Sequence, residues 1–263
     1  MNLRSGRELE RLHEANAITV ETLHLVAREV EPGVTTHHLD RVAANNLRRH
    51  GVAPAFKGYH VQGAGRFPRS LCVSVNQEVV HGIPSRWRRL REGDIVGLDF
   101  GCIVGGYYGD NAMTVPVGEI SEEKARLLEV TEQALHAGIR AARPGARVSD
   151  IGHAVQTHVE GNGYSVVREL GGHGIGTSLH EQPWIPNFGR PGRGARLAPG
   201  SVIAIEPMVN AGGAAVRTRR DRWTIVTADG SLSAHFERSI AVTDDGPWIL
   251  AEPRPSGRPP KED

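Results

Sequence analysis

The sequence predicts an α+β protein, and three observations lead to this fold class. Two pairs of segments carry apolar residues at helical spacing, and each pair is followed by strand-like segments. Short turn motifs join strand-like segments, which favours antiparallel sheets. The second helix pair also repeats the spacing of the first, so we expect two similar halves, over about 7–118 and 121–245.

Four helices are expected from the apolar spacing and from the residues that end each run. Glycine, alone or after proline, follows every run, and neither residue type continues a helix well. Ser121 and the two glutamates after it are typical of a helix start. The predicted helices cover 7–29, 36–49, 121 to near 144, and 148 to about 161.

The two halves are related by a fixed shift along the chain. Moving the sequence by 112 residues places Pro32-Gly33 on Pro144-Gly145, and Gly51 on Gly163. We interpret this match as an internal duplication. Two copies are too few for a solenoid, so we expect two α/β halves that face one another about a pseudo-twofold axis, with a site between them.

The strand-like segments are rich in β-branched and aromatic residues and are bounded by turn residues. The motifs GGYYGD and TADGSLS are typical of hairpin turns, so consecutive strands should pair antiparallel. The expected strand segments are 70–76, 78–83, 94–118, 201–209 and 221–243.

The composition fits one globular domain. Lys and Arg total 31 against 30 Asp and Glu, so the net charge of +1 gives no global attraction to nucleic acid. A hydrophobic share of 39% with 23% charged residues excludes disorder of the whole chain. We expect a single domain over 1–251 and a disordered, proline-rich tail over 252–263.

Cysteine use and the N-terminus indicate the compartment. Cys72 and Cys102 lack CxxC spacing, which excludes a zinc ribbon, a thioredoxin-type centre and a disulfide framework, so both should be reduced and buried. The N-terminal segment is charged throughout, and no apolar run approaches membrane-spanning length. The sequence therefore predicts a cytoplasmic protein without membrane contact.

Four acidic residues lie inside otherwise apolar segments. They are Asp99, Asp110, Glu206 and Glu237, and His173 lies in the glycine-rich segment LGGHGIG. An unpaired carboxylate in an apolar strand carries a large desolvation cost, so something must compensate it. A salt bridge to an arginine explains one such residue, but four together with a histidine favour bound cations.

The residue types indicate which cations, and which chemistry. Asp99 and Asp110 are eleven residues apart across a predicted hairpin, so antiparallel pairing can bring both to one face. Four carboxylates with one imidazole suit a pair of divalent ions such as Mn, Fe or Co better than a thiolate-selecting metal. Paired ions activate water for hydrolysis, so hydrolysis is the predicted reaction class.

Two further histidines and several absent motifs narrow the prediction. His81 in VVHGIP and His180 in SLHEQP lie in turns at strand ends, where a histidine is usually solvated. Because both flank the acidic segments, we assign them to substrate binding. The sequence has no HExxH, GxSxG or P-loop motif, and Gly172–Gly176 lacks the spacing of a dinucleotide loop.

Two arginine clusters raise the question of RNA contact. They lie within 86–91 and 217–222 and could contact ribosomal RNA. Few aromatic residues accompany them, so a solvated surface is the favoured interpretation. We expect no sequence-specific nucleic-acid binding.

Six segments, in this order, resemble the bacterial type I methionine aminopeptidases: SLCVSVNQEVVHGIP, GDIVGLDFG, YYGDNAMTVPVG, GGHGIGTSLHEQPWIPN, IAIEPM and SAHFERSIAVT. The resemblance spans roughly 5–251. It implies the pita-bread fold, in which two pseudo-symmetric α/β halves with largely antiparallel sheet enclose a dimetal site. It also implies removal of the initiator Met from nascent chains when the next residue is small.

The same resemblance implies the metal ligands. Asp99, Asp110 and Glu237 would hold one ion. Asp110, His173, Glu206 and Glu237 would hold the other, so Asp110 and Glu237 would bridge the pair. Glu206 would also take a proton from the attacking water and pass it to the leaving amine. Two divalent ions per chain are implied, of Co, Mn, Fe or Zn.

The substrate residues follow from the resemblance too. His180 would stabilise the carbonyl oxygen during attack, and His81 would contact the amide nitrogen beyond the scissile bond. Tyr59, Cys72 and Trp223 match positions in or near the methionine pocket. The implied partners are N-termini of nascent polypeptides, with a possible ribosome contact, and the protein is expected to be a monomer.

Three departures from the family pattern cluster near the predicted pocket. Tyr108 stands where bacterial members commonly carry His, and Leu179 where Phe is frequent. The segment 57–70 is longer than the usual link. These changes could widen the pocket, while the hydrolytic residues are intact.

Other functions remain open at the sequence level. Aminopeptidase P and prolidase share this catalytic fold but carry a large N-terminal domain for which 263 residues leave no room. A broader-specificity aminopeptidase is a further possibility. Binding proteins on the same fold, including ribosome-associated relatives, lose metal ligands, whereas this sequence has all five.

Overall fold

The computed structural model describes residues 2–254 and contains four helices in the described range. The helices are α1 (Gly6–Arg28), α2 (Thr36–His50), α3 (Glu122–Ala141) and α4 (Val148–Gly161). The strands of the N-terminal half are β1 (Ala53–Pro54), β2 (His60–Val61), β3 (Gly65–Arg66), β4 (Leu71–Val75), β5 (Glu78–Val80), β6 (Ile95–Val104) and β7 (Tyr107–Pro116). Those of the C-terminal half are β8 (Ser165–Val166), β9 (Gly171–Gly174), β10 (Glu181–Pro186), β11 (Val202–Ile205), β12 (Met208–Asn210), β13 (Val216–Thr218), β14 (Ile225–Thr227), β15 (Ser233–His235), β16 (Glu237–Thr243) and β17 (Gly246–Ile249).

The four predicted helices are confirmed and differ from the prediction only at their ends. The Ser5 hydroxyl accepts a hydrogen bond from the Glu8 amide while the Glu8 carboxylate accepts one from the Ser5 amide, so α1 begins with a capping box. The hydroxyls of Thr35 and Ser121 cap α2 and α3, where each accepts a hydrogen bond from the amide three residues on. Gly51, with φ of 67°, ends α2 in the left-handed conformation. Across residues 2–254, no helix is both long and apolar enough to cross a membrane.

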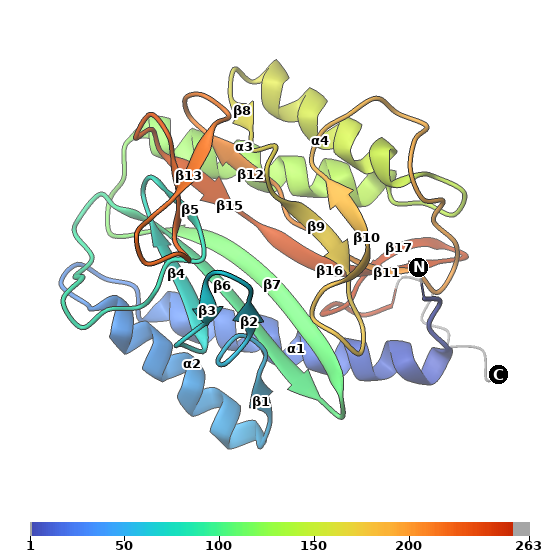
Figure 1. Ribbon diagram of the computed structural model, residues 1–263, viewed down its shortest axis with the longest axis horizontal. Helices are drawn as coiled ribbons and strands as arrows, with labels where there is room; N and C mark the ends of the chain where they lie inside the picture. The colour runs from blue at the N-terminus through green and yellow to red at the C-terminus, as the bar shows by residue number, and fades with distance from the viewer. Residues whose placement is uncertain (1, 255–263) are drawn as a thin grey trace.

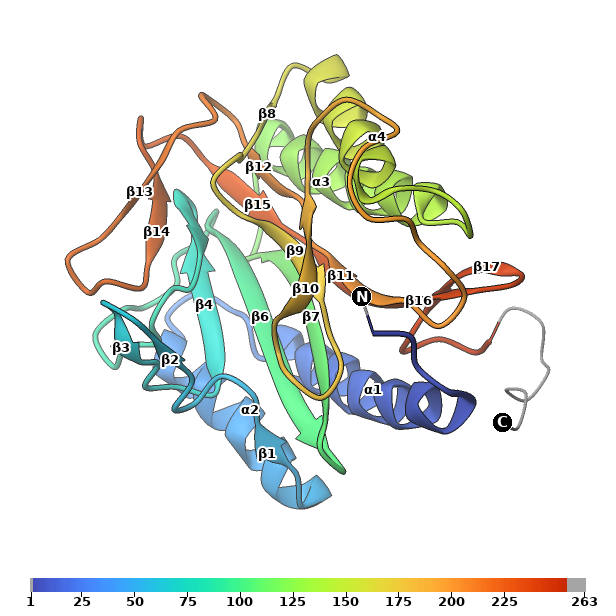
Figure 2. The same cartoon turned by 45° about the vertical axis from the view of Figure 1, so that its right-hand side comes forward.

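A sheet of nine strands forms the centre of the molecule (Figure 1). Its strands follow the order β1-β6-β7-β16-β11-β9-β10, with β4 also paired to β6 and β17 to β16. The pairings within this sheet are antiparallel, as predicted. Figure 2 shows the long β6–β7 hairpin with β4 beside it. The sheet therefore joins the N-terminal and the C-terminal halves of the chain through the β7–β16 pairing.

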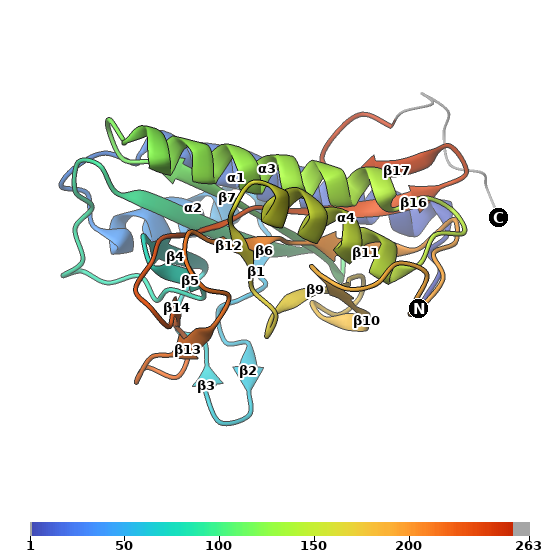
Figure 3. The same ribbon diagram turned by 90° about the horizontal axis from the view of Figure 1, so that it is seen from above.

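The helices and the short hairpins lie on opposite sides of this sheet. Helices α1 and α3 run along one side in Figure 3, and the hairpins β2–β3 and β13–β14 project from the other. The strands β9 and β10 also lie on the hairpin side. Any site on the hairpin side is thus supported from behind by packed helices.

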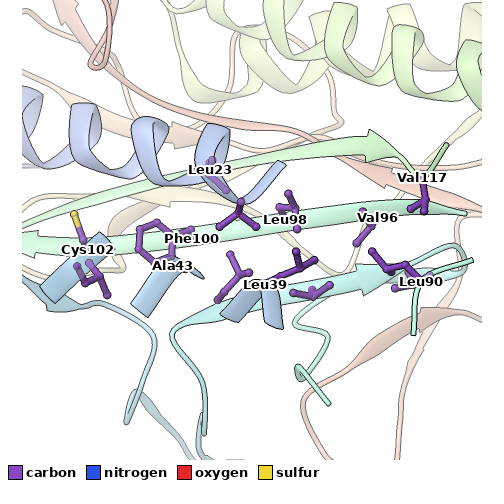
Figure 4. Packing of buried hydrophobic residues seen from close by; sticks show 14 of the residues in the cluster. Leu23, Leu39, Ala43, Leu90, Val96, Leu98, Phe100, Cys102 and Val117 are labelled. Atoms are coloured by element: carbon purple, nitrogen blue, oxygen red, sulfur yellow. The ribbon is translucent and has the colours of Figure 1, made fainter. Parts of the chain in front are cut away.

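Helix packing fixes the long strand β6 from one face. Leu23 of α1 and Leu39 of α2 pack with Leu98 and Phe100 of β6, and each of these side chains is at most 1% exposed (Figure 4). Successive side chains of a strand point to opposite faces. Asp99, between Leu98 and Phe100, is consequently turned away from this helix-packed core.

The sequence-based turn predictions were half correct. GGYYGD closes the β6–β7 hairpin at Gly105 and Gly106, which have φ of 55° and 87°. The prediction for TADGSLS was wrong, because β14 and β15 on either side of it do not pair with each other. Strand β14 pairs with β13 and β5, whereas β15 pairs with β12. Asp229 accepts hydrogen bonds from the Gly213 and Ser231 amides and so holds this turn as a link between two small sheets.

The prediction that both cysteines are reduced and buried is confirmed, whereas most of the predicted disordered tail lies outside the described residues. Cys72 and Cys102 are both free and buried. The proposed disordered tail, 252–263, lies outside the described residues from position 255 onward.

Candidate metal centre

The five predicted ligands come from neighbouring parts of the central sheet. Strands β6, β7, β16 and β9 carry Asp99, Asp110, Glu237 and His173, and Glu206 directly follows β11, which lies between β16 and β9. Asp99 lies opposite Ala112 and Asp110 opposite Gly101, so the two aspartates are diagonal neighbours on one face of the β6–β7 hairpin. The face of the sheet opposite the helix-packed core is therefore lined with carboxylates.

One detail of the sequence prediction needs correction. Glu206 was expected inside a strand, but it lies one residue beyond β11, before Pro207. Proline has no amide hydrogen and cannot continue the hydrogen-bonded ladder, so strand β11 ends before it and the next strand, β12, begins after it. The Asn187 side chain donates a hydrogen bond to the Glu206 carbonyl, which fixes this break.

The ligand atoms are close enough to share a cation. Asp110, His173 and Glu237 each offer one atom within 4.8 Å of the others. His173 Nε2 lies 3.9 Å from Asp110 Oδ2 and 3.7 Å from Glu206 Oε1. Asp99 lies outside this group of three, diagonally across the hairpin from Asp110.

Burial makes the negative charges unfavourable without a cation. It raises the pKa of Asp99 to about 7 and that of Glu206 to about 8, with repulsion from Asp99 adding to the latter. Burial and the neighbouring carboxylates hold the pKa of Asp110 and of Glu237 well above the usual range. The protein thus keeps four carboxylates where each disfavours the ionisation of the others.

Three carboxylate oxygens in this cluster have no hydrogen-bond partner within residues 2–254. They are Asp99 Oδ1, Asp110 Oδ1 and Glu237 Oε1, and all three are buried. Buried polar atoms are normally satisfied, so these oxygens require a ligand. Divalent cations prefer such oxygen-rich donor sets, and the residues present therefore fit metal ions.

His173 is held in the tautomer that a metal ligand needs. Its Nδ1 lies 2.9 Å from the Gly174 carbonyl oxygen, which only accepts, so Nδ1 carries the proton and Nε2 keeps its lone pair. Burial lowers the pKa of His173 to about 3, which keeps the ring neutral. A Cβ at Gly172 would meet the Ala204 carbonyl oxygen at 2.2 Å, so glycine is required beside this histidine.

A cavity of about 110 Å³ opens beside the carboxylates. The predicted substrate residues Tyr59, Cys72, His81, His180 and Trp223 all line it. The aromatic wall also includes two residues that the sequence analysis missed, Phe56 and Phe67. The structure thus brings an apolar pocket and the carboxylate cluster together.

Contacts between the lining residues orient the histidines. Tyr59 Oη lies 2.6 Å from His180 Nδ1, and the His180 and His173 rings are 4.3 Å apart. His81 meets Trp223 edge to face, and Trp223 in turn meets Phe67. Burial lowers the pKa of His81 to about 4 and also lowers that of His180. Both rings are therefore neutral at physiological pH.

A second, larger cavity of about 410 Å³ adjoins the first. His81, His173, His180 and Glu206 line both cavities. Trp184, which is 49% exposed, forms part of the second cavity's wall. The carboxylate cluster is thus reached from a small apolar pocket on one side and a wider space on the other.

The family departures do not all lie at the pocket. Leu179 lines the smaller cavity, and the long 57–70 segment contributes Tyr59, Val61 and Phe67 to its wall. Tyr108 is not one of the described residues that line this cavity. The Tyr108 amide instead donates to the Gly176 carbonyl oxygen.

The sequence missed one more residue near the cluster, His235. It is 4% exposed, and its Nε2 lies 3.7 Å from Glu206 Oε2. It lies two residues before Glu237, and residues two apart in an extended segment point to the same face, so this spacing could have indicated that His235 lies beside the cluster.

Comparison with known proteins places this geometry in a family. Residues 10–244 match the model of metallopeptidase family M24. The chain belongs to this family. It is 48% identical to a methionine aminopeptidase of Clostridium acetobutylicum and 49% identical to methionine aminopeptidase 1 of Bacillus subtilis, each match covering 94% of this chain and 97% of the relative.

Solved structures agree with the sequence relatives. A methionine aminopeptidase from Thermotoga maritima superposes with a TM-score of 0.92 at 40% identity, over 96% of this chain and 99% of that chain. An Xaa-Pro dipeptidase from Bacillus anthracis superposes with a TM-score of 0.75 at 21% identity and shows the fold alone. The predicted α+β pita-bread fold and the resemblance to bacterial type I methionine aminopeptidases are confirmed, as is the prediction of a metal-dependent aminopeptidase.

The carboxylate cluster predicts an unusual pH dependence of stability in metal-free protein. The pKa values of Asp99, Asp110, Glu206 and Glu237 lie above those of the unfolded chain. Between pH 7 and 9 the folded state therefore binds more protons than the unfolded state, so its stability falls as pH rises. Histidines do not oppose this trend, because they are largely neutral in both states there.

Urea unfolding of chelator-treated protein at pH 7, 8 and 9 measures this slope. We expect the unfolding free energy to fall with pH, and to fall less steeply in Glu237→Gln. Glu160→Gln on the exposed side of α4 is the matched control and should keep the wild-type slope. A stability that is constant or rises over this range would contradict the account.

Proposed function

We propose that this protein removes the N-terminal methionine from nascent polypeptides when the second residue is small. The observation that carries the proposal is the apolar cavity of about 110 Å³ that opens directly onto the carboxylate–histidine cluster. Cavities of roughly 150 Å³ hold a molecule as small as benzene, so this space suits one side chain. The relatives that share nearly half of its residues over almost their whole length are named for this activity.

The five clustered residues would hold two divalent ions. Asp99, Asp110 and Glu237 would bind one, and Asp110, His173, Glu206 and Glu237 the other, with Asp110 and Glu237 bridging. Co, Mn, Fe and Zn all suit this donor set. Bound there, the ions would lower the pKa of an attacking water and polarise the scissile carbonyl.

Glu206 is suited to move the proton of the reaction. A carboxylate beside the reacting atoms can both take and give a proton. Glu206 lines both cavities and so lies where the pocket for the first residue meets the space for the rest of the chain. Glu206 would take the proton of the attacking water and pass it to the leaving amine.

His180 is suited to donate a hydrogen bond to the substrate. Tyr59 Oη lies 2.6 Å from its Nδ1, and donation from Tyr59 leaves the proton of the neutral ring on Nε2. That Nε2–H would stabilise the carbonyl oxygen as negative charge develops on it. His81, on the wall shared with the second cavity, would contact the amide nitrogen beyond the scissile bond.

The pocket composition favours methionine. Phe56, Phe67 and Trp223 give it aromatic walls, and a thioether packs favourably against aromatic rings. Cys72, the cross-strand partner of Asp99, stands between the apolar wall and the carboxylates. An unbranched side chain would therefore place its backbone carbonyl beside the cluster.

The alternative functions are not favoured. The Xaa-Pro dipeptidase structure is only 21% identical, against 40% for the methionine aminopeptidase of Thermotoga maritima. A binding protein without catalysis has no need for five metal-type residues gathered from five strands. A metallopeptidase that acts on methionine explains both the cluster and the pocket.

The partners and setting follow as finer proposals. Nascent chains are made in the cytoplasm, where a monomer of this protein would meet their N-termini. A ribosome contact through the arginine clusters has weaker support, because Glu78 pairs with Arg219 at 2.6 Å and lies 3.8 Å from Arg88. Part of the basic charge is thus neutralised within the protein.

Peptide specificity tests the proposal directly. Chelator-stripped protein, reloaded in turn with Mn, Fe, Co and Zn, is assayed for release of the first residue of Met-Ala-Ser, Met-Lys-Ser, Leu-Ala-Ser and Ala-Pro-Ser. We expect metal-dependent cleavage of Met-Ala-Ser only. Cleavage of Leu-Ala-Ser would indicate that Leu179 and the 57–70 segment widen the pocket, and no cleavage with any metal would contradict the proposed function.

The role of Glu206 has a separate test. Glu206→Gln keeps the size of the side chain but cannot carry the proton, so kcat should fall by about 10²- to 10⁴-fold. At least one ion should remain bound through Asp99, Asp110 and Glu237, as measured by elemental analysis. The control Glu160→Gln should keep full activity, and near-normal turnover in Glu206→Gln would refute the proton-transfer role.

A further inference from the structure

The structure holds a buried imidazole nitrogen that the proposed reaction leaves unexplained. His235 is the last residue of β15 and is 4% exposed. Its Nε2 is buried and has no hydrogen-bond partner within residues 2–254. Native proteins rarely leave such an atom unpaired, so a specific partner is expected.

The backbone of His235 is fixed in place from two sides. Its amide donates a hydrogen bond to Thr114 Oγ1, and the same hydroxyl donates to the His235 carbonyl oxygen. Across the ladder, His235 pairs with Met208 of β12. The side chain can therefore adjust its ring but cannot move away from the cluster.

A candidate acceptor is the carboxylate of Glu206. Glu206 lies between two imidazoles: Oε1 is 3.7 Å from His173 Nε2, and Oε2 is 3.7 Å from His235 Nε2. The two histidines differ in the protonation of this nitrogen. His173 Nε2 has a lone pair, because its Nδ1 donates to the Gly174 carbonyl. Once Glu206 is ionised, its carboxylate oxygens only accept, so His235 Nε2 is satisfied by carrying a proton toward Glu206 or by binding an ion.

We propose that His235 is a positioning residue that donates its Nε2–H to Glu206 Oε2. A shift of less than an ångström by either side chain brings the two atoms to the usual separation of about 2.9 Å. The bond holds one carboxylate oxygen and leaves Oε1 turned toward His173, on the side of the proposed ions. Its effect on turnover rests on the proposed function, whereas the hydrogen bond and its effect on metal affinity do not.

The matched variants separate the donor from the imidazole ring. His235→Gln keeps an N–H donor at similar reach, and His235→Leu removes the donor while keeping apolar volume. Ser233→Ala is the control, because Ser233 lies on the same strand and donates a buried hydrogen bond to the Val209 carbonyl, away from Glu206. Thermal unfolding of each variant checks that it folds before the measurements are compared.

Two measurements test for the hydrogen bond from His235 to Glu206 without any assay of activity. In metal-free protein at pH 9, where Glu206 is ionised, the ¹⁵N shifts of His235, assigned by their loss in His235→Gln, should show the proton on Nε2. In calorimetric titration with Mn²⁺, His235→Leu should bind metal roughly 10- to 100-fold more weakly, whereas His235→Gln and Ser233→Ala should stay within about threefold of wild type.

Each contrary result overturns the proposal. A proton on Nδ1, or wild-type metal affinity in His235→Leu, removes the hydrogen bond to Glu206. Equal loss of affinity in the Gln and Leu variants would make the imidazole itself a metal ligand.

Kinetics give a further test. In active protein, His235→Leu should lower kcat with little change in KM, and His235→Gln should restore kcat. If no variant or wild-type protein cleaves Met-Ala-Ser, the proposed function fails while the shifts and affinities still decide the role of His235.

Discussion

Burial of four carboxylates on one face of the central sheet is the constraint on which the rest of the structure depends. Burial raises the cost of ionising Asp99, Asp110, Glu206 and Glu237, and repulsion from neighbouring carboxylates adds to that cost for the last three. Such an arrangement is unfavourable for folding alone. It is understandable as a receptor for divalent cations, which is what membership in a metallopeptidase family requires.

The sheet topology is what makes this crowding possible. Four neighbouring strands and the residue after a fifth each bring one residue of the cluster, and the pairing of β7 with β16 joins residues from the two halves of the chain. Helices α1 and α2 pack behind β6 through Leu98 and Phe100, so Asp99 between them is held toward the site. The helix-packed core therefore fixes the geometry of the cluster as well as the stability of the fold.

Sequence reasoning predicted the helices, the β6–β7 hairpin and the five clustered residues because each has a local signal. Caps and glycines mark the helices, and an acidic residue in an apolar strand is anomalous wherever it pairs. The partners of β14 and β15 had no local signal, so TADGSLS was mistaken for a hairpin. Phe56, Phe67 and His235 were missed because ordinary residue types become functional only through tertiary contacts. The internal duplication stays a prediction.

The central claim is that these residues form one site shared by two ions, and metal stoichiometry tests it most directly. Chelator-stripped protein is reloaded with Mn²⁺, freed of excess metal and measured by elemental analysis, alongside Asp110→Ala. The account predicts two ions per chain in wild-type protein and no tightly bound ion in Asp110→Ala, because Asp110 would serve both ions. Two ions retained by Asp110→Ala, or none bound by wild-type protein, would contradict it.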